Sequence, residues 1–395
     1  METKLYRNIK LSAIINRFFS INQIASIPNI FFIILLSIIG ISLLLLYSAG
    51  HGLYPWCVRQ LAHFAFGFGV MLVVGSTRIR IWYSFAYVLY VAAFVCLLFT
   101  AFFGKIGMGA QRWIQIASIQ FQPSEIMRIA LVAALARRFN DVPLTKTSPL
   151  KLILFPSLLV ILPVLVTLEQ PDLGTAMLLV ICSVAMFFFA GMRVRFFVMI
   201  FIGFIACLPI FWHFLHDYQK NRIFTFLHPE KDPLGCGYHV IQSKIAIGSG
   251  GFLGKGFMQG SQGALDFLPE KHTDFIFTLL SEEFGFIGAL ILLTLYCLFI
   301  LFGLSLALSL KDNFRRLVIL GMTVSFSLYA IINIAMVVGL LPVVGIPLPF
   351  VSYGGTSLVT LLAGQGLVIA SAYYKQTERR IKLYGARLNN SKCNF

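Results

Sequence analysis

The chain has 395 residues, of which 58% are hydrophobic and 12% are charged, and it contains 39 phenylalanines. So few polar residues could not cover that much apolar surface in water, so the composition excludes a soluble domain and indicates an integral membrane protein. The formal net charge of +16 is concentrated in short segments between apolar runs, which is typical of membrane topology and of attraction to anionic lipid rather than of nucleic-acid binding.

Apolar runs follow one another along the chain, each about 20 residues long, the length that a helix needs to cross the hydrocarbon core. We predict ten transmembrane helices, at about residues 29–49, 58–76, 82–102, 124–139, 150–168, 172–191, 194–214, 281–308, 315–339 and 352–374. The expected fold is therefore an all-α polytopic membrane protein. The fourth run is short and contains Ser124, Glu125 and Arg128, which favours a helix that lines an internal cavity rather than one that faces lipid.

The distribution of charge predicts the orientation, because cytoplasmic loops retain Lys and Arg. With the N-terminus inside, most of the 31 basic residues fall in cytoplasmic segments, and most of the 15 acidic residues fall outside or within the membrane. We expect residues 1–28 to be a cytoplasmic segment, residues 29–374 one domain in the cytoplasmic (inner) membrane, and residues 375–395 a basic cytoplasmic tail. Since no small-residue cleavage site follows an apolar core in the first 28 residues, the first span is predicted to be an uncleaved anchor.

One hydrophilic interruption, at about residues 215–280, is much longer than the others and falls on the extracytoplasmic side. Its length predicts some secondary structure. Ile241, Ile245 and Ile247, separated by polar residues, indicate a short amphipathic helix on the membrane surface. Closely spaced glycines follow between Gly248 and Gly263. Because glycine allows close backbone approach to a ligand, we expect this segment to grip the substrate.

Two polar clusters flank the fourth to sixth predicted helices on the same side. The first contains Arg112, Trp113, Gln122, Ser124, Glu125 and Arg128. Pro123 stands at a helix start, and Glu125 and Arg128 share one helix face. An interfacial tryptophan and a helix-stabilising ion pair would also explain this cluster. The second is Glu169–Thr175, in which Asp172 could equally be the N-cap of a helix after a tight turn.

Two further clusters lie closer to the C-terminus. Asp274 is in the polar segment Phe267–Phe277, beside a long apolar run and close to Lys271 and His272. A carboxylate at the edge of the hydrocarbon region destabilises the fold, so it is retained mainly where function requires it. The segment Gly345–Gly355 contains two prolines, Ser352 and Tyr353. It therefore predicts loop or re-entrant backbone that is buried in protein or lines a cavity, and a purely structural role is also open for it.

Five stretches resemble the SEDS family of shape, elongation, division and sporulation proteins in their order and spacing. They are Gly109–Arg128, Gln170–Thr175, Gly237–Gly251, Leu268–Phe277 and Pro342–Gly355, and they are distributed over nearly the whole chain. The stretches Tyr238–Lys244 and Glu270–Asp274 are more similar to the elongation members of the family than to the division members.

The resemblance implies a peptidoglycan glycosyltransferase for cell-wall elongation and rod shape. Such an enzyme polymerises lipid II into β-1,4-linked glycan strands at the extracytoplasmic face and releases undecaprenyl pyrophosphate. The resemblance also implies that Asp274 is the essential aspartate and that Trp113, Glu125 and Arg128 line its cavity. The family more often has Lys where this chain has Arg128, and Arg keeps the charge but changes the hydrogen-bond geometry. The implied partners are a class B penicillin-binding protein, which is a transpeptidase, and other proteins of the elongation machinery.

The types of residue in these segments also fit this chemistry without reference to the family. Glycosyl transfer from a lipid pyrophosphate needs a base for the attacking hydroxyl and cations for the leaving group. We assign Asp274 as the catalytic base, and the available cations are Arg112, Arg128, Lys244 and Lys271. The other substrate-binding candidates are Trp113, Gln122, Ser124, Glu125, His272, Ser352 and Tyr353. A divalent cation, Mg²⁺ or Mn²⁺, could bridge the phosphates and the carboxylate, but the sequence contains no metal-ligand signature.

Three alternative functions fit parts of the sequence. A lipid II flippase or transporter would suit ten spans with intramembrane Glu125 and Arg128. However, the sequence shows neither paired broken helices nor inverted halves, and its carboxylates gather on the outer side. The others are a non-catalytic scaffold for cell-wall synthases and a polymerase of the division type. Lipid II and membrane lipid are the expected non-protein partners, and no nucleic acid is expected.

Overall fold

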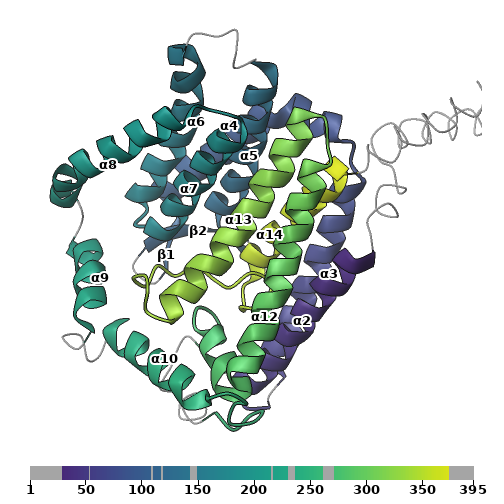
Figure 1. Cartoon of the computed structure of the whole chain (residues 1–395), viewed down its shortest axis with the longest axis vertical. Coiled ribbons are helices and arrows are strands. Elements are labelled where there is room, and N and C mark those ends of the chain that lie inside the picture. Colours follow the sequence, from purple (N-terminus) through teal and green to yellow (C-terminus); the bar gives the residue numbers. More distant parts are fainter. Residues whose placement is uncertain are drawn as a thin grey trace, which may run out of the picture.

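The computed structural model describes residues 29–52, 54–107, 110–116, 119–142, 149–214, 217–229, 236–260 and 271–372. The predicted segments 1–28 and 375–395 lie outside the described residues. Each predicted span coincides with one helix: α2 (Asn29–Ala49), α3 (Pro55–Ser76), α4 (Ile79–Phe103), α5 (Pro123–Asp141), α6 (Pro149–Glu169), α7 (Leu173–Phe189), α8 (Val194–Phe214), α12 (Ile276–Leu308), α13 (Asn313–Val337) and α14 (Gly355–Ala372). The all-α membrane fold is confirmed (Figure 1).

The helices differ in length and in how apolar they are. Among the described residues, α2, α3, α4, α12, α13 and α14 are long and apolar enough to cross a membrane, and α6, α7 and α8 contain shorter apolar stretches. Large apolar side chains on their outer faces are exposed, such as Leu36 at 58% and Val88 at 61%. Such faces are stable against lipid tails, where apolar exposure carries no penalty.

Helix α13 occupies the centre of the bundle and contacts α5, α7, α12 and α14 (Figure 1). It buries residues on all sides, from Phe314 to Val337. Helix α5 is also buried along most of its length, from Pro123 to Phe139, and it packs between α4 and α13. The prediction that this helix does not face lipid is confirmed, and the internal cavity that it was expected to line stays a prediction.

A small antiparallel sheet connects α4 to α5. Its strands β1 (Lys105–Gly107), β2 (Ala110–Ile116) and β3 (Ile119–Phe121) are arranged in the order β1-β2-β3. The sequence predicted only a connection here. Strands β1 and β3 have only three residues each, too few for a periodic apolar pattern to show.

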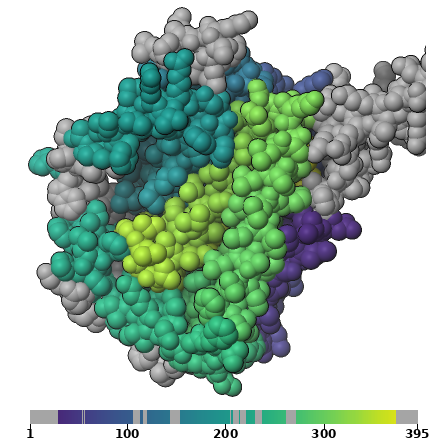
Figure 2. Space-filling model, viewed as in Figure 1, coloured from purple at the N-terminus to yellow at the C-terminus, as the bar shows by residue number. Residues whose placement is uncertain are grey.

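The long interruption after α8 contains two described helices, α9 (Asp217–Leu227) and α10 (Cys236–Gly250). Together with α8 they form an arc around one side of the bundle (Figure 1), and α7 lies recessed behind α8 and the end of α13 (Figure 2). The helix predicted around Ile245 is present. Its packed face, however, is formed by Val240, Ser243 and Ala246, while Ile245 is 48% exposed.

The chain that follows α10 crosses α12 at residues 282–287. Gly285 interrupts the helix with φ 63° and ψ −157°, and its neighbours Phe286 and Ile287 donate backbone hydrogen bonds to Gly251 O and Phe252 O. A Cβ at Gly254 would lie 2.1 Å from Glu283 O. The described part of the glycine-rich segment therefore packs backbone against backbone on α12. Close packing accounts for Gly254, and substrate binding by this segment stays a prediction.

Candidate active site

Asp274 lies in a turn, residues 271–275, immediately before α12. It is half-buried, and the backbone around it is held by three hydrogen bonds. Asp274 O accepts from Asn333 Nδ2 at 2.9 Å, Thr273 O accepts from Ser352 Oγ at 2.5 Å, and His272 O accepts from the Tyr353 amide at 2.8 Å. Three consecutive carbonyl groups are thus bound by two separate elements, which holds the backbone from which the Asp274 side chain extends.

The opposite wall is the loop between α13 and α14, residues 342–354, which we call the Pro342 loop. It is irregular, as the two prolines of Gly345–Gly355, Pro347 and Pro349, predicted. Other helices bind its carbonyl oxygens: Ser42 Oγ donates to Val351 O, Gln60 Nε2 to Ser352 O, Tyr296 OH to Pro349 O and Asn333 Nδ2 to Ile346 O, at 2.7–3.0 Å. Irregular backbone inside a membrane protein requires such partners.

Gly345 is where the Pro342 loop meets the carboxylate. A Cβ at this position would lie 3.6 Å from Asp274 Oδ2, and the backbone φ is 73°. Positive φ favours glycine. The start of α7 supports the same part of the loop from behind, because a Cβ at Gly174 would lie only 2.8 Å from Val344 O.

An aromatic and basic cluster stands beside the Asp274 turn. The His272 ring lies 4.4 Å from the Trp56 ring, and Tyr353 packs edge-on to Trp56 at 4.8 Å. Lys271 is buried, with Nζ 2.9 Å from His51 Nε2. The structure therefore brings together five of the predicted site residues: Lys271, His272, Asp274, Ser352 and Tyr353. Trp56 and His51 join them from α2–α3, and the sequence analysis missed both.

Glu125 and Arg128 form a second, fully interior cluster. Arg128 Nη2 lies 2.9 Å from Glu125 Oε2, and both side chains are 5% exposed, which confirms that the two share a face. Arg128 Nη1 donates to Ser325 Oγ at 2.7 Å. Glu125 also accepts hydrogen bonds from Tyr329 OH at 2.7 Å and Thr360 Oγ1 at 3.1 Å. The charges are paired and hydrogen-bonded, as buried charges must be.

One face of α13 connects the two clusters. Ser325 binds Arg128, Tyr329 binds Glu125, and Asn333 binds the Asp274 turn. These three residues are four positions apart, so each step along the helix is about 6 Å. The sequence analysis missed all three as site residues. The signal for them was the i, i+4, i+8 spacing of polar side chains in an apolar helix.

The remaining candidates of the first cluster gather at the start of α7. Arg112 on β2 donates to Pro171 O and has Nη1 3.6 Å from Asp172 Oδ1, and Gln122 Nε2 donates to Asp172 Oδ2 at 2.8 Å. Asp172 is indeed the N-cap of α7, because it accepts a hydrogen bond from the Thr175 amide. Trp113 is half-buried on β2, and Ser124 is buried at the start of α5.

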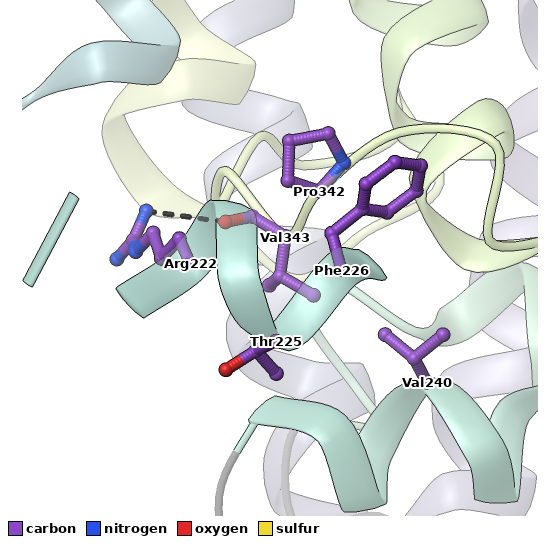
Figure 3. A pocket seen from close by; sticks show the side chains of 6 residues that line it. All are labelled: Arg222, Thr225, Phe226, Val240, Pro342 and Val343. Carbon is purple, nitrogen blue, oxygen red and sulfur yellow. Dashed lines mark hydrogen bonds between the residues drawn. The ribbon is translucent and has the colours of Figure 1, made fainter. Parts of the chain in front are cut away.

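Two cations approach the Pro342 loop from the α9–α10 side. The exposed Lys244 extends over Gly339, where a Cβ would lie 2.1 Å from Lys244 Cε. Arg222 on α9 donates to Val343 O at 3.2 Å and lines a small pocket with Thr225, Phe226, Val240 and Pro342 (Figure 3). Within the described ranges, no three His, Cys, Asp or Glu side chains stand together as metal ligands would.

Comparison with known proteins agrees with this arrangement. Residues 23–377 match the model of a cell cycle protein family, that of FtsW, RodA and SpoVE. The chain is 43% identical to the peptidoglycan glycosyltransferase MrdB of Escherichia coli K12 over 342 residues, which are 86% of this chain and 91% of that protein.

Two solved structures share the fold. A chain of a peptidoglycan synthase complex, solved in a study of how polymerization and crosslinking are coordinated, superimposes with a TM-score of 0.76 at 30% identity, covering 87% of this chain and 97% of that one. The rod shape determining protein RodA of Thermus thermophilus gives a TM-score of 0.67 at 25% identity, covering 87% and 96%. With a family match over most of its length, this chain belongs to the FtsW, RodA and SpoVE family of cell cycle proteins, the SEDS family that its motifs resemble.

Proposed function

We propose that the Asp274 turn and the Pro342 loop form the site at which this peptidoglycan glycosyltransferase of the elongation type joins lipid II units. Asp274 acts as the general base. It removes the proton from the attacking sugar hydroxyl while the bond from the donor sugar to its pyrophosphate breaks. The undecaprenyl pyrophosphate leaves with both electrons of that bond, and a general base contributes about 10² to 10⁴ in rate.

The observation that carries this proposal is a half-buried carboxylate on a turn whose backbone is held by hydrogen bonds. Three carbonyl hydrogen bonds fix the backbone of the turn at His272, Thr273 and Asp274, and Gly345 leaves space in front of Oδ2. A base on a fixed backbone needs less reorganisation before proton transfer than one on a mobile loop. Partial burial of Asp274 reduces the access of water to the carboxylate and still leaves it open to a substrate.

The cations differ in what they can offer a pyrophosphate. Both terminal nitrogens of Arg128 already bind Ser325 and Glu125, so its charge chiefly balances Glu125. Lys244 is exposed beside the Pro342 loop, and Arg112 is 20% exposed at the start of α7. We assign the leaving pyrophosphate to Lys244 and Arg112, and Arg112 would exchange its contact with Asp172 for a phosphate oxygen.

The test is polymerisation of lipid II by the purified protein. Asp274→Asn is nearly isosteric, so it should abolish glycan strands while the protein still inserts and folds. Asp312→Asn is the matched control, because Asp312 is the N-cap of α13 and Asn caps a helix as well as Asp. Polymerisation by Asp274→Asn at the wild-type rate would remove Asp274 from the mechanism. Transport of lipid II without strands would favour a flippase, and neither activity would favour a scaffold.

The proposal also includes the orientation of the protein in the membrane and its protein partner. The multi-pass chain would lie in the inner membrane with the Asp274 turn on the extracytoplasmic side, as the distribution of Lys and Arg predicts. A class B penicillin-binding protein would crosslink the strands made here. The support is the resemblance to a chain of a peptidoglycan synthase complex.

A further inference from the structure

A groove lies between α4, α5 and α6, at the end of these helices opposite to Asp172. It has a volume of about 340 Å³ and is lined by Tyr87, Arg138, Leu154 and Phe155. This volume is within the range of about 300–1,000 Å³ that small-molecule sites occupy. The groove shares no residue with the Asp274 turn, the Pro342 loop or the Glu125 cluster, so it is not part of the proposed active site.

The charge at the groove is positive. Arg138 contributes one wall, and its guanidinium lies 5.0 Å from the centre of the Phe155 ring. The neighbouring Arg137 stacks on Tyr87 at 4.7 Å and pairs with Asp141 at 3.7 Å. Two arginines against one carboxylate leave a net positive charge at this end of α5. A guanidinium binds a phosphate through parallel N–H donors.

The rest of the lining is apolar and continues along α6. Leu154 is 66% exposed, Phe155 42% and Leu158 50%, and Ile161 and Leu165 continue the same exposed face at 50% and 55%. A free phosphate or a nucleotide would leave this surface without a partner. A molecule with a phosphate at one end and a hydrocarbon chain at the other satisfies both parts of the groove.

We propose that the groove binds an anionic phospholipid, with its phosphate at Arg138 and one acyl chain along Leu154, Leu158 and Ile161. The helix ends around it belong to the side that the charge distribution places in the cytoplasm, so the lipid would come from the inner leaflet. Tyr90 OH donates to Leu159 O at 2.8 Å. This bond joins α4 to α6 about one turn further along both helices.

The experiment uses the purified full-length protein in nanodiscs that contain palmitoyl-oleoyl phosphatidylglycerol and the matching phosphatidylethanolamine. The protein is then released from the nanodiscs, and native mass spectrometry measures the ratio of the two lipids that stay bound to it. The wild type should retain phosphatidylglycerol preferentially, and Arg138→Gln should lower that ratio about fivefold, the contribution typical of one basic residue near a membrane surface. Arg195→Gln is the control, because Arg195 is an exposed arginine on α8 at the same predicted side.

A second variant tests the apolar half. Leu154→Trp places a bulky side chain at an exposed position in the groove, where folding should be unaffected, and it should reduce retained phosphatidylglycerol as well. The proposal is overturned if the wild type retains both lipids equally, if Arg138→Gln keeps the wild-type ratio, or if Arg195→Gln lowers the ratio as much. None of these results depends on polymerisation, so they are independent of the role of Asp274.

Discussion

Asn333 joins the Asp274 turn to the Pro342 loop through a single side-chain amide. Its Nδ2 donates to Asp274 O at 2.9 Å and to Ile346 O at 2.7 Å, and the residue is fully buried. Asn333→Ala removes the donor from two carbonyl groups, so we expect the free energy of unfolding to fall by about 1–3 kcal/mol. The polymerisation rate should fall roughly 10²-fold, the size expected when a reacting group moves by about 1 Å.

Both effects can be measured on purified protein, by thermal unfolding and by glycan synthesis from lipid II at a temperature where the variant is folded. Asn313→Ala is the matched control, because Asn313 is the exposed first residue of the same helix. It should change neither quantity. A folded Asn333→Ala protein that polymerises at the wild-type rate would show that the turn keeps its geometry without this amide.

Arg128 shows how one residue fits its neighbours in this particular chain. Its two terminal nitrogens bind different partners, Glu125 and Ser325, while the guanidinium carbon lies 4.6 Å from the centre of the Tyr329 ring. A lysine ammonium is a single point without a planar fork, so it could not make these three contacts in the same geometry. Arginine at position 128 therefore fits the contacts that Ser325 and Tyr329 offer. From sequence alone, only the i, i+3 spacing of Glu125 and Arg128 could be recognised.

The helices could be predicted because each needs one continuous signal. An apolar run of sufficient length fixed α2 and α8 at their observed bounds. The start of α12 was placed five residues late, at 281 rather than Ile276, because element boundaries are the least certain part of a prediction from sequence. The interruption at Gly285 gave no signal at all, since an isolated glycine in a helical pattern is usually tolerated.

The interrupted start of α12 depends on Gly285. Its φ of 63° is a conformation that other residues rarely adopt, and a Cβ there would lie 2.3 Å from Gly254 N. Gly285→Ala should therefore lower the melting temperature strongly, because backbone strain of about 1–3 kcal/mol is added to a clash that flexible side chains cannot relieve. Thermal unfolding in detergent measures this.

Gly40→Ala provides the comparison. Gly40 lies in the middle of α2 with nothing within 4 Å of a built Cβ. Alanine there should raise the free energy of unfolding by up to about 1 kcal/mol, since it favours the helix. Equal melting temperatures for Gly285→Ala and the wild type would mean that residues 250–256 can move off α12, and that the packing at this crossing is looser than the contacts indicate.

Across the whole molecule, the residues of the site could be predicted from the sequence, but the contacts between them could not. Asp274, Glu125 and the Pro342 loop each stood out as polar residues or prolines beside apolar runs. The hydrogen bond between Tyr329 and Glu125 joins residues 204 positions apart, and Asn333 contacts residues on two different elements. Such contacts follow from how helices pack, and one sequence contains no local pattern that encodes them.

The orientation of the molecule decides whether the Asp274 turn meets lipid II outside the cell. Two exposed positions report on it: Ser249 at the end of α10, on the Asp274 side, and Asn140 at the end of α5, near the groove. In a cysteine-free background, we expect Ser249→Cys to react with a membrane-impermeant maleimide in intact cells, and Asn140→Cys to react only after permeabilisation. The reason is that Arg137 and Arg138 stand beside Asn140, and cytoplasmic segments retain such residues. Labelling of Asn140→Cys in intact cells would invert the orientation and would place Asp274 where extracytoplasmic strands could not be made.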